Sequence, residues 1–419
     1  MDILMSLVGV VTLLAIAFAL SNNKKAINKR TVFGALAIQA AFGGFVLYVP
    51  VGKDILKTVS DGVSSVIGYA QNGIGFLFGD LANFKVGFIF AVNVLPVIVF
   101  FSSLIAVLYY LGVMQWIIRI IGGALQKALG TSRTESMSAT ANIFVGQTEA
   151  PLVVRPFIAT MTNSELFAIM VGGLASIAGS VMAGYAQMGV PIEYLVAASF
   201  MAAPGGLLMA KLMHPETEEA KNDMSDLPED PDKPANVLDA AAAGASSGMH
   251  LALNVGAMLL AFVGLIAMLN GIIGGIGGFI GMEGLTLELI LGYIFMPLAF
   301  LIGVPWNEAL VAGSFIGQKI VVNEFVAYLN FAPYLKDVAD GGILVEATQA
   351  VMTDRTKAII SFALCGFANL SSIAILLGGL GAMAPTRRHD LAKLGIRAVI
   401  AGSLANLMSA TLAGLFLAI

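Results

Sequence analysis

Long apolar stretches separated by short polar segments make up most of the chain. A transmembrane helix needs roughly 17–25 predominantly apolar residues to cross the hydrocarbon core of a bilayer. The pattern therefore predicts about eight such helices, near Ile3–Leu20, Thr31–Val51, Phe88–Ile118, Leu166–Met188, Tyr194–Leu212, His250–Ile273, Ala358–Ala384 and Leu394–Ile419. The stretch Lys53–Asn83 mixes Gly, Asn and Asp with apolar residues, which favours an interfacial helix and loop.

Basic residues gather in three of the polar segments, and this bias predicts how the chain is oriented. They are Lys24, Lys25, Lys29 and Arg30 after the first span, Arg119, Lys127 and Arg133 after the third, and Arg387, Arg388, Lys393 and Arg397 before the last. Loops rich in Lys and Arg stay in the cytoplasm. We therefore expect all three clusters on the cytoplasmic side and both termini on the outer side. The first span follows Met1-Asp2 rather than a basic segment, so it is expected to be retained rather than cleaved as a signal.

Two further segments are too interrupted by polar residues, Gly and Pro to cross as single helices. In Ser136–Thr160 and in Trp306–Phe331 we expect two short helical arms that dip into the membrane and return. The tips are predicted at Gly146–Thr148 and near Gly317–Asn323. Non-helical backbone at membrane depth is tolerated only where protein or a water-filled cavity covers it.

Two short patterns occur twice in the same order, which indicates an internal repeat. Phe144-Val145-Gly146-Gln147 returns as Phe315-Ile316-Gly317-Gln318, and Gly173-Leu174-Ala175-Ser176-Ile177 returns as Gly366-Phe367-Ala368-Asn369-Leu370. Because three predicted spans separate the two hairpins, the second should enter from the opposite side. Inverted repeats with broken helices and a site at the midplane are typical of secondary transporters.

Composition agrees with a membrane protein. Of the 419 residues, 11% are charged and 58% hydrophobic, and the mean hydropathy is +0.89. These values exclude a soluble enzyme, a disordered protein and a nucleic-acid binder, and a single cysteine, Cys365, excludes a disulfide scaffold. The fold class predicted is an all-α integral membrane protein.

The stretch Glu216–Asp239 carries nine of the 26 acidic residues and two of the 22 basic ones. We interpret it as a solvated cytoplasmic loop between two halves, with a regulatory tether as the alternative. The predicted organisation is N-terminal scaffold spans over 1–86, a first repeat over 87–213 with its hairpin near 134–160, the linker over 214–239, and a second repeat over 240–419 with its hairpin near 306–331.

Two acidic residues near the predicted hairpin tips are the first candidates for chemistry. An acid at a helix centre in the bilayer costs at least about 2.5–3.5 kcal/mol, so such a residue is a functional candidate by default. Glu149 follows Gln147 and Thr148, and the alternative role for it is an ion pair with Arg155. Glu324 follows Asn323, a candidate helix cap, and the alternative for Glu324 is neutralisation by Lys319.

Neutral oxygen donors near the predicted helix breaks form two further groups. Asn369 and Ser372 are three residues apart and share a helical face. A second group has the neutral oxygen ligands that Na⁺ takes in broken-helix transporters: Asn142, Val145, Ser176 and Ile177. The alternative is interhelical hydrogen bonding for the first group and ordinary helix packing for the second.

The remaining motifs carry no chemistry. The segment Gly274-Gly275-Ile276-Gly277-Gly278 lacks the Lys-Ser/Thr of a phosphate loop. The three histidines have no acidic or Cys partner at metal-binding spacing, and the sequence contains neither a nucleophile triad nor a nucleotide motif. An intramembrane enzyme is therefore disfavoured. A passive channel or facilitator stays open as an alternative to coupled transport.

Three motifs resemble the concentrative nucleoside transporter family in its short bacterial form. They are Gly146-Gln147-Thr148-Glu149-Ala150-Pro151-Leu152, the pattern Gly317-x-Lys319-x3-Asn323-Glu324-Phe325-Val326-Ala327-Tyr328, and Cys365-Gly366-Phe367-Ala368-Asn369-Leu370-Ser371-Ser372. The resemblance spans essentially the whole chain. It implies cation-driven uptake of nucleosides such as uridine across the bacterial inner membrane by a homotrimer, in which a mobile transport domain moves like an elevator against a scaffold. No nucleic-acid partner is implied.

The same resemblance implies roles for individual residues. Gln147, Thr148 and Glu149 would hold the nucleobase, with Val181 as an apolar contact. Glu324, Asn369 and Ser372 would hold the ribose, with Phe367 beside it. Asn142, Val145, Ser176 and Ile177 would bind Na⁺ as the coupling ion. Some relatives use H⁺ instead, and the preference between purine and pyrimidine nucleosides stays open.

Overall fold

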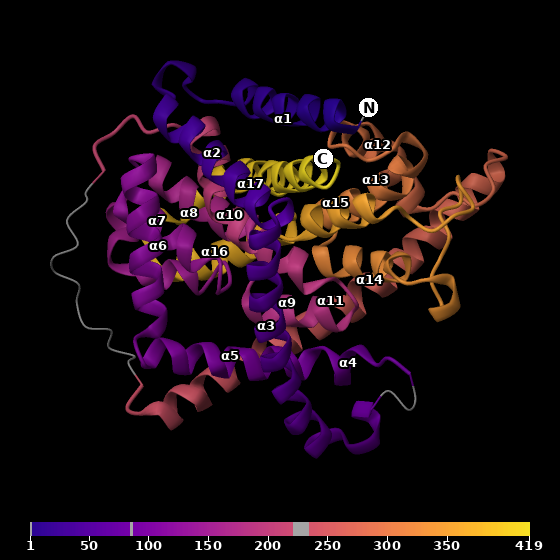
Figure 1. Cartoon of the computed structure of the whole chain (residues 1–419), viewed down its shortest axis with the longest axis horizontal. Coiled ribbons are helices and arrows are strands. Elements are labelled where there is room, and N and C mark those ends of the chain that lie inside the picture. The colour runs from indigo at the N-terminus through magenta and orange to yellow at the C-terminus, as the bar shows by residue number, and fades with distance from the viewer. Residues whose placement is uncertain (1, 84–86, 221–233) are drawn as a thin grey trace.

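The computed structural model describes residues 2–83, 87–220 and 234–419, and these residues fold almost entirely as helices (Figure 1). Most of the predicted acidic linker, 221–233, lies outside the described residues. The first part of the chain forms α1 (Asp2–Ala19), α2 (Lys29–Leu47), α3 (Pro50–Phe78), α4 (Phe90–Asn93), α5 (Leu95–Tyr110), α6 (Val113–Leu129), α7 (Arg133–Ala141), the 3₁₀ helix η3 (Ala150–Thr160), α8 (Asn163–Ala175), α9 (Gly179–Gln187) and α10 (Ile192–Met213). The second part forms α11 (Val237–Phe279), α12 (Leu287–Leu301), α13 (Trp306–Val321), α14 (Glu324–Leu335), α15 (Asp354–Leu364), α16 (Ser371–Met383) and α17 (Arg388–Phe416).

Helices occupy each stretch for which the hydrophobic pattern predicts a span. Within the described residues, six helical stretches are long and apolar enough to cross a membrane: Lys29–Leu47, Phe90–Tyr110, Asn163–Gln187, Ile192–Met213, Val237–Phe279 and Pro385–Phe416. The helix α1 is apolar but slightly shorter, and α15 and α16 share one predicted span. The chain is thus an all-helical protein with several membrane-spanning helices.

The prediction for the third span was wrong at its C-terminal end. The helix stops at Tyr110 instead of continuing to Ile118, and a separate helix, α6, begins at Val113. Gly112 between them has φ +80°, in the left-handed region that favours glycine. The chain therefore turns at a single residue inside an apolar run, where hydropathy alone gives no signal.

The sequence interpretation also missed α12, an apolar helix of 15 residues. It is shorter than a typical membrane span and contains Pro297. At the break that follows, the chain bends by 117° into α13, the first arm of the predicted second hairpin. Similarly, α11 begins at Val237, inside the stretch predicted as linker.

The helix α3 covers most of the segment predicted to lie in the membrane interface. It begins at Pro50, whose missing N–H suits the first turn of a helix. Figure 1 shows α3 running crosswise to α1 and α5. That direction is the one expected of an interfacial helix beside spans.

Both segments predicted as hairpins consist of two helical arms joined by a turn. The first comprises α7 and η3, with the turn at Asn142–Glu149, and the second comprises α13 and α14, joined at Val322-Asn323. A capping box between Ser132 and Glu135 fixes the start of α7. The two segments predicted to be locally opened are broken as well, between α8 and α9 and between α15 and α16.

Burial separates the interior of the molecule from its periphery. The best membrane window of α8–α9 is 100% buried and that of α10 94%, whereas only 17% of the α11 window is buried. Because α5 packs along α11, these two form an outer layer against the buried helices. Most of α11 presents apolar side chains such as Leu260 and Phe279 outward, as expected of a surface that faces lipid or another subunit.

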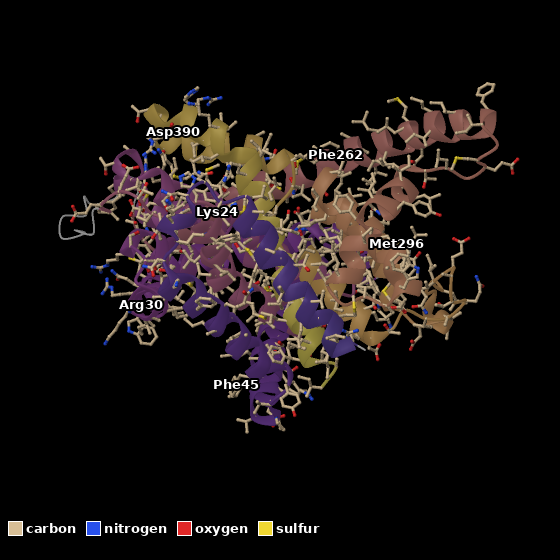
Figure 2. The ribbon with its side chains drawn as sticks, turned by 90° about the horizontal axis from the view of Figure 1, so that it is seen from above. Lys24, Arg30, Phe45, Phe262, Met296 and Asp390 are labelled. Carbon is tan, nitrogen blue, oxygen red and sulfur yellow. The ribbon has the colours of Figure 1, made fainter. Side chains whose placement is uncertain are left out.

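Both chain ends lie on the same side of the molecule in Figure 1. Figure 2 places Lys24, Arg30 and Asp390 toward the opposite end from Phe262 and Met296. The arrangement agrees with basic clusters on one membrane face, and which face is cytoplasmic stays a prediction.

Candidate functional site

A cavity of about 860 Å³ lies where the two hairpin tips meet the two helix breaks. All eight residues predicted to bind substrate line it: Gln147, Thr148, Glu149, Val181, Glu324, Phe367, Asn369 and Ser372. They come from positions as far apart in the chain as 147 and 372. The fold therefore brings the sequence candidates together in one cavity.

Glu324 lines this cavity from the start of α14. The side chain of Asn323 accepts a hydrogen bond from the Val326 N–H and caps α14, as predicted, which places Glu324 in the first helical turn. Glu324 is buried, with 4% of the residue exposed. Oε2 accepts a hydrogen bond from Asn369 Nδ2 at 2.8 Å, and Oε1 accepts one from the Tyr185 hydroxyl at 3.2 Å.

Lys319 and Glu324 attract each other electrostatically, but no direct ion pair between them is found among the described residues. The Lys319 ammonium donates to Asn406 Oδ1 at 2.6 Å. Glu324 is instead surrounded by neutral donors, and donors of that kind leave its acceptor capacity available to a ligand.

Asn369 organises the break between α15 and α16. Its Oδ1 accepts hydrogen bonds from the Ser372 N–H at 2.9 Å and from the Ser371 hydroxyl at 2.7 Å. On the other side, Gln147 Nε2 lies 3.5 Å from Ser372 Oγ, so the first hairpin tip reaches the second break. Both halves of the chain thus contribute polar atoms to one site.

Glu149 occupies a different environment from Glu324, since its side chain is exposed and lines the cavity. The Glu149 side chain packs closely over Gly146, where a Cβ would meet Glu149 Oε2 and force this side chain to shift. The carboxylate therefore folds back over the tip backbone and stays accessible to a ligand in the cavity.

The four predicted cation ligands lie at the junction of the first hairpin tip with the α8–α9 break. The Phe144 carbonyl accepts a hydrogen bond from the Gly179 N–H at 2.9 Å, which holds the tip against the break. Among the described residues, the buried Asn142 Oδ1 has no hydrogen-bond partner, while its Nδ2 donates to the Ser138 carbonyl. Ser176 and Ile177 lie in the break itself and are buried.

The donors at this junction suit Na⁺. They comprise an amide oxygen, a hydroxyl and backbone carbonyls of opened helix, which are the oxygen ligands that broken-helix transporters use for this ion. A buried amide oxygen without a partner is costly unless a ligand satisfies it. The residues present therefore fit the ion.

Sequence reasoning missed two aromatic residues of the site. Tyr185 is fully buried on α9 and supplies a donor to Glu324. Tyr109 on α5 lines the cavity, and its buried hydroxyl has no partner among the described residues. Both lie in apolar helices without a motif, and only the need of a buried carboxylate for donors could have pointed to Tyr185.

Across residues 2–83, 87–220 and 234–419, no cluster of three or more His, Cys, Asp or Glu side chains could hold a metal. Cys365 is buried, as expected of a packing residue.

A helical membrane protein with an internal cavity of amides, hydroxyls and two carboxylates belongs to the class of transporters for neutral polar solutes. Models of Na⁺-dependent nucleoside transporters match residues 8–81 and 194–414, and a nucleoside-recognition gate model matches residues 91–191. The chain is 53% identical to nucleoside permease NupC of Helicobacter pylori, over 99% of this chain and 98% of that protein. It is 38% identical to sodium/nucleoside cotransporter 2 of Rattus norvegicus, over 98% of this chain and 62% of that protein.

A solved structure of CNTnw in an inward-facing substrate-bound state superimposes with a TM-score of 0.93 at 63% identity, covering 99% of this chain and 98% of that one. The chain belongs to the Na⁺-dependent nucleoside transporter family, the concentrative nucleoside transporters. It is a nucleoside transporter and not an enzyme.

Proposed function

We propose that this transporter is a symporter that imports nucleosides across the bacterial inner membrane, driven by a Na⁺ gradient. The observation that carries the proposal is the adjacency of two sites on one hairpin. The tip that contributes Gln147 and Glu149 to the cavity also bears Asn142, whose buried amide oxygen lacks a partner. An ion bound at Asn142 therefore biases the position of the nucleoside ligands.

The proposed division of the site follows the chemistry of a nucleoside, which has hydroxyls at one end and a flat ring at the other. Glu324, Asn369 and Ser372 hold the ribose, beside Phe367. Gln147, Thr148 and Glu149 bind the edge of the base, and Val181 contacts its face. Such a site rejects analogues that lack the bonded hydroxyl, because its buried polar groups are then left unpaired.

Na⁺ is proposed as the coupling ion, with Asn142, Val145, Ser176 and Ile177 as its ligands. Typical coupling free energies of about 1–3 kcal/mol raise the affinity for the second ligand 5–150-fold. H⁺ is the second candidate ion, since Glu149 is an ionisable group exposed to the cavity.

We further propose that the chain works as a homotrimer by an elevator mechanism. Residues 1–86 contribute to the scaffold, while the two repeats, 87–213 and 240–419, carry the hairpins of the mobile domain. The outward-facing apolar surface of α11 suits contact with lipid or with neighbouring protomers. With the linker in the cytoplasm, the cavity, which extends to Pro234, faces inward.

Uptake into proteoliposomes tests the coupling. At fixed pH, we expect an inward Na⁺ gradient to drive uridine accumulation above equilibrium, and choline in place of Na⁺ to abolish it. A pH gradient without Na⁺ should be ineffective. Accumulation driven by the pH gradient alone would assign H⁺ as the ion, and equilibration under every gradient would identify a passive facilitator.

A further inference from the structure

A buried lysine lies next to the site without contacting the cavity. Lys319 lies on α13, the first arm of the predicted second hairpin. It is 2% exposed and does not line the cavity. Its ammonium donates to Asn406 Oδ1 on α17 at 2.6 Å. An ionisable group at membrane depth is costly, so a charge balance for this lysine must lie close by.

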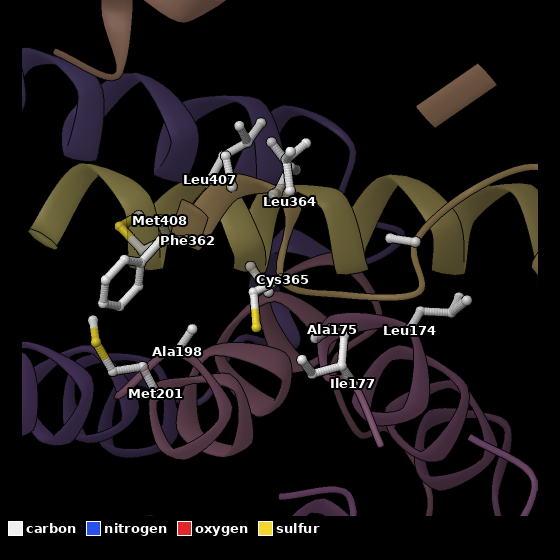
Figure 3. Close-up of a cluster of buried hydrophobic side chains, with 14 of the residues drawn as sticks. Leu174, Ala175, Ile177, Ala198, Met201, Phe362, Leu364, Cys365, Leu407 and Met408 are labelled. Carbon is white, nitrogen blue, oxygen red and sulfur yellow. The ribbon is translucent and has the colours of Figure 1, made fainter. Parts of the chain in front are cut away.

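Asn406 connects that ammonium to the ends of two helices. Its Nδ2 donates to the carbonyls of Ala175, at 2.5 Å, and of Cys365, at 2.9 Å. Ala175 is the last residue of α8, and Cys365 is the C-cap of α15. Figure 3 shows Cys365 close to Ala175 and Ile177, beneath α17 with Leu407 and Met408.

Several negative groups offset the charge of the ammonium. Each helix C-terminus carries about half a negative elementary charge, and the Glu324 carboxylate attracts Lys319 electrostatically. In broken-helix transporters, such half-helix ends and opened carbonyls are the places that coordinate a cation. Here, the cation is the ammonium of Lys319, which is part of the second hairpin.

Asn406 and the two helix breaks pack closely against one another. A Cβ at Gly366 would lie 2.3 Å from Asn406 Oδ1, so only glycine leaves room for the amide. The two breaks also bond each other directly, since the Phe367 N–H donates to the Ser176 carbonyl at 3.1 Å. The Leu370 N–H donates to the carbonyl of Ile320, the residue after Lys319.

Lys319 and Asn406 therefore lie between the proposed Na⁺ ligands and the proposed ribose ligands. Ser176, at the first break, belongs to the proposed Na⁺ site, and Asn369, at the second, belongs to the ribose site. We propose that the Lys319 ammonium, held by Asn406, is a built-in cation that fixes the two helix breaks relative to each other and so couples Na⁺ binding to nucleoside binding. Asn406 is thereby a positioning residue. This inference rests on the proposed Na⁺ coupling.

The test measures uridine binding by calorimetry to the purified full chain in lipid nanodiscs, with saturating NaCl or with choline chloride. The readout is the dissociation constant in choline chloride divided by the dissociation constant in NaCl. Asn406→Asp keeps an acceptor for Lys319 but removes the amide donor to both carbonyls, and Lys319→Met removes the ammonium but keeps Asn406. We expect each variant to lower the ratio about fivefold or more, mainly by weakening binding in NaCl.

Thr411→Val is the matched control, because Thr411 is a buried polar residue of α17 whose hydroxyl, within the described part of the chain, donates only to the Leu407 carbonyl of its own helix. It should keep the wild-type ratio. A variant that is not monodisperse is replaced by Asn406→Leu, which also removes the amide, or by Lys319→Gln, which also removes the charge, and is judged by the same ratio.

The outcomes separate this inference from the proposed function. If uridine binding by the wild type is equal in NaCl and choline, the Na⁺ coupling itself fails. If the wild type responds to Na⁺ and a folded variant keeps the full ratio, even with weaker binding in both salts, Lys319 and Asn406 have a structural role only and the inference is overturned.

Discussion

The Tyr185 hydroxyl is one of two side-chain donors to the Glu324 carboxylate in the described part of the chain. The tyrosine ring packs against Tyr328 and Phe325, with centroids 4.3 Å and 4.8 Å away. Its position is thus fixed by packing, and its hydroxyl is aimed at the carboxylate that we assign to the ribose. This arrangement predicts an effect on sugar recognition from a residue that no motif contains.

Tyr185→Phe should weaken uridine binding about tenfold, because a hydrogen bond to a charged group contributes roughly 1.5–3 kcal/mol. The loss acts through Glu324, so binding of 2′,3′-dideoxyuridine should change little. Competition against radiolabelled uridine in membrane vesicles measures both affinities.

Tyr328→Phe is the control for this prediction. It removes a similar hydroxyl from the neighbouring ring, but that hydroxyl donates to the Ser361 carbonyl at 2.7 Å and not to Glu324. Its effect should be equal for the two nucleosides. An equal loss of both nucleosides in Tyr185→Phe would mean that the tyrosine supports the fold alone.

At the level of elements, the sequence predicts the hairpins and breaks well because their signals are local. Gly146, Pro151 and Asn323 interrupt apolar runs, and their effect on the backbone does not depend on distant contacts. The turn at Gly112 and the helix α12 were missed for the opposite reason. There, apolar residues continue across the bend, and tertiary packing decides where each helix ends.

The candidate site likewise contains residues that the sequence predicts and residues that only the structure reveals. The acidic residues and amides stand out because polar groups are rare in this chain, and all eight substrate candidates line one cavity. Tyr185 and Asn406 escaped notice because Tyr and Asn are common in membrane helices, where they serve packing or interhelical hydrogen bonds. Their roles depend on which buried group they meet, and only the folded structure determines that.

The contact between hairpin 1 and the α8–α9 break requires glycine at 179. A Cβ there would lie 2.9 Å from the Phe144 carbonyl oxygen, so Gly179→Ala must push the tip away from the break. Overpacking of this kind costs roughly 1–3 kcal/mol. We expect the Na⁺ concentration for half-maximal uridine uptake to rise about tenfold, which corresponds to about 1.4 kcal/mol.

Gly264→Ala on α11 is the matched control, because a Cβ at that helical glycine meets no atom within 4 Å. It should leave the Na⁺ dependence of uptake unchanged. If Gly179→Ala also leaves the half-maximal Na⁺ concentration unchanged, then the tip and the break do not form the cation site together.

For the whole molecule, acidic and basic residues are concentrated in different parts of the sequence. The 26 acids and 22 bases give a net charge of −4, but the linker holds nine of the acids and only two of the bases, so the rest of the chain is positive. Eleven of the remaining 20 bases lie in the three clusters that the positive-inside rule assigns to the cytoplasm. Figures 1 and 2 place both chain ends away from Arg30 and Asp390.

Cysteine labelling in intact cells tests the resulting orientation. Ile419, at the C-terminal end, and His389, beside the last basic cluster, are both exposed, whereas the native Cys365 is buried and should not react. A membrane-impermeant maleimide should label Ile419→Cys in intact cells and His389→Cys only after permeabilisation. The reverse pattern would invert the topology, turn the cavity that reaches Pro234 toward the outside, and make the described state outward-facing.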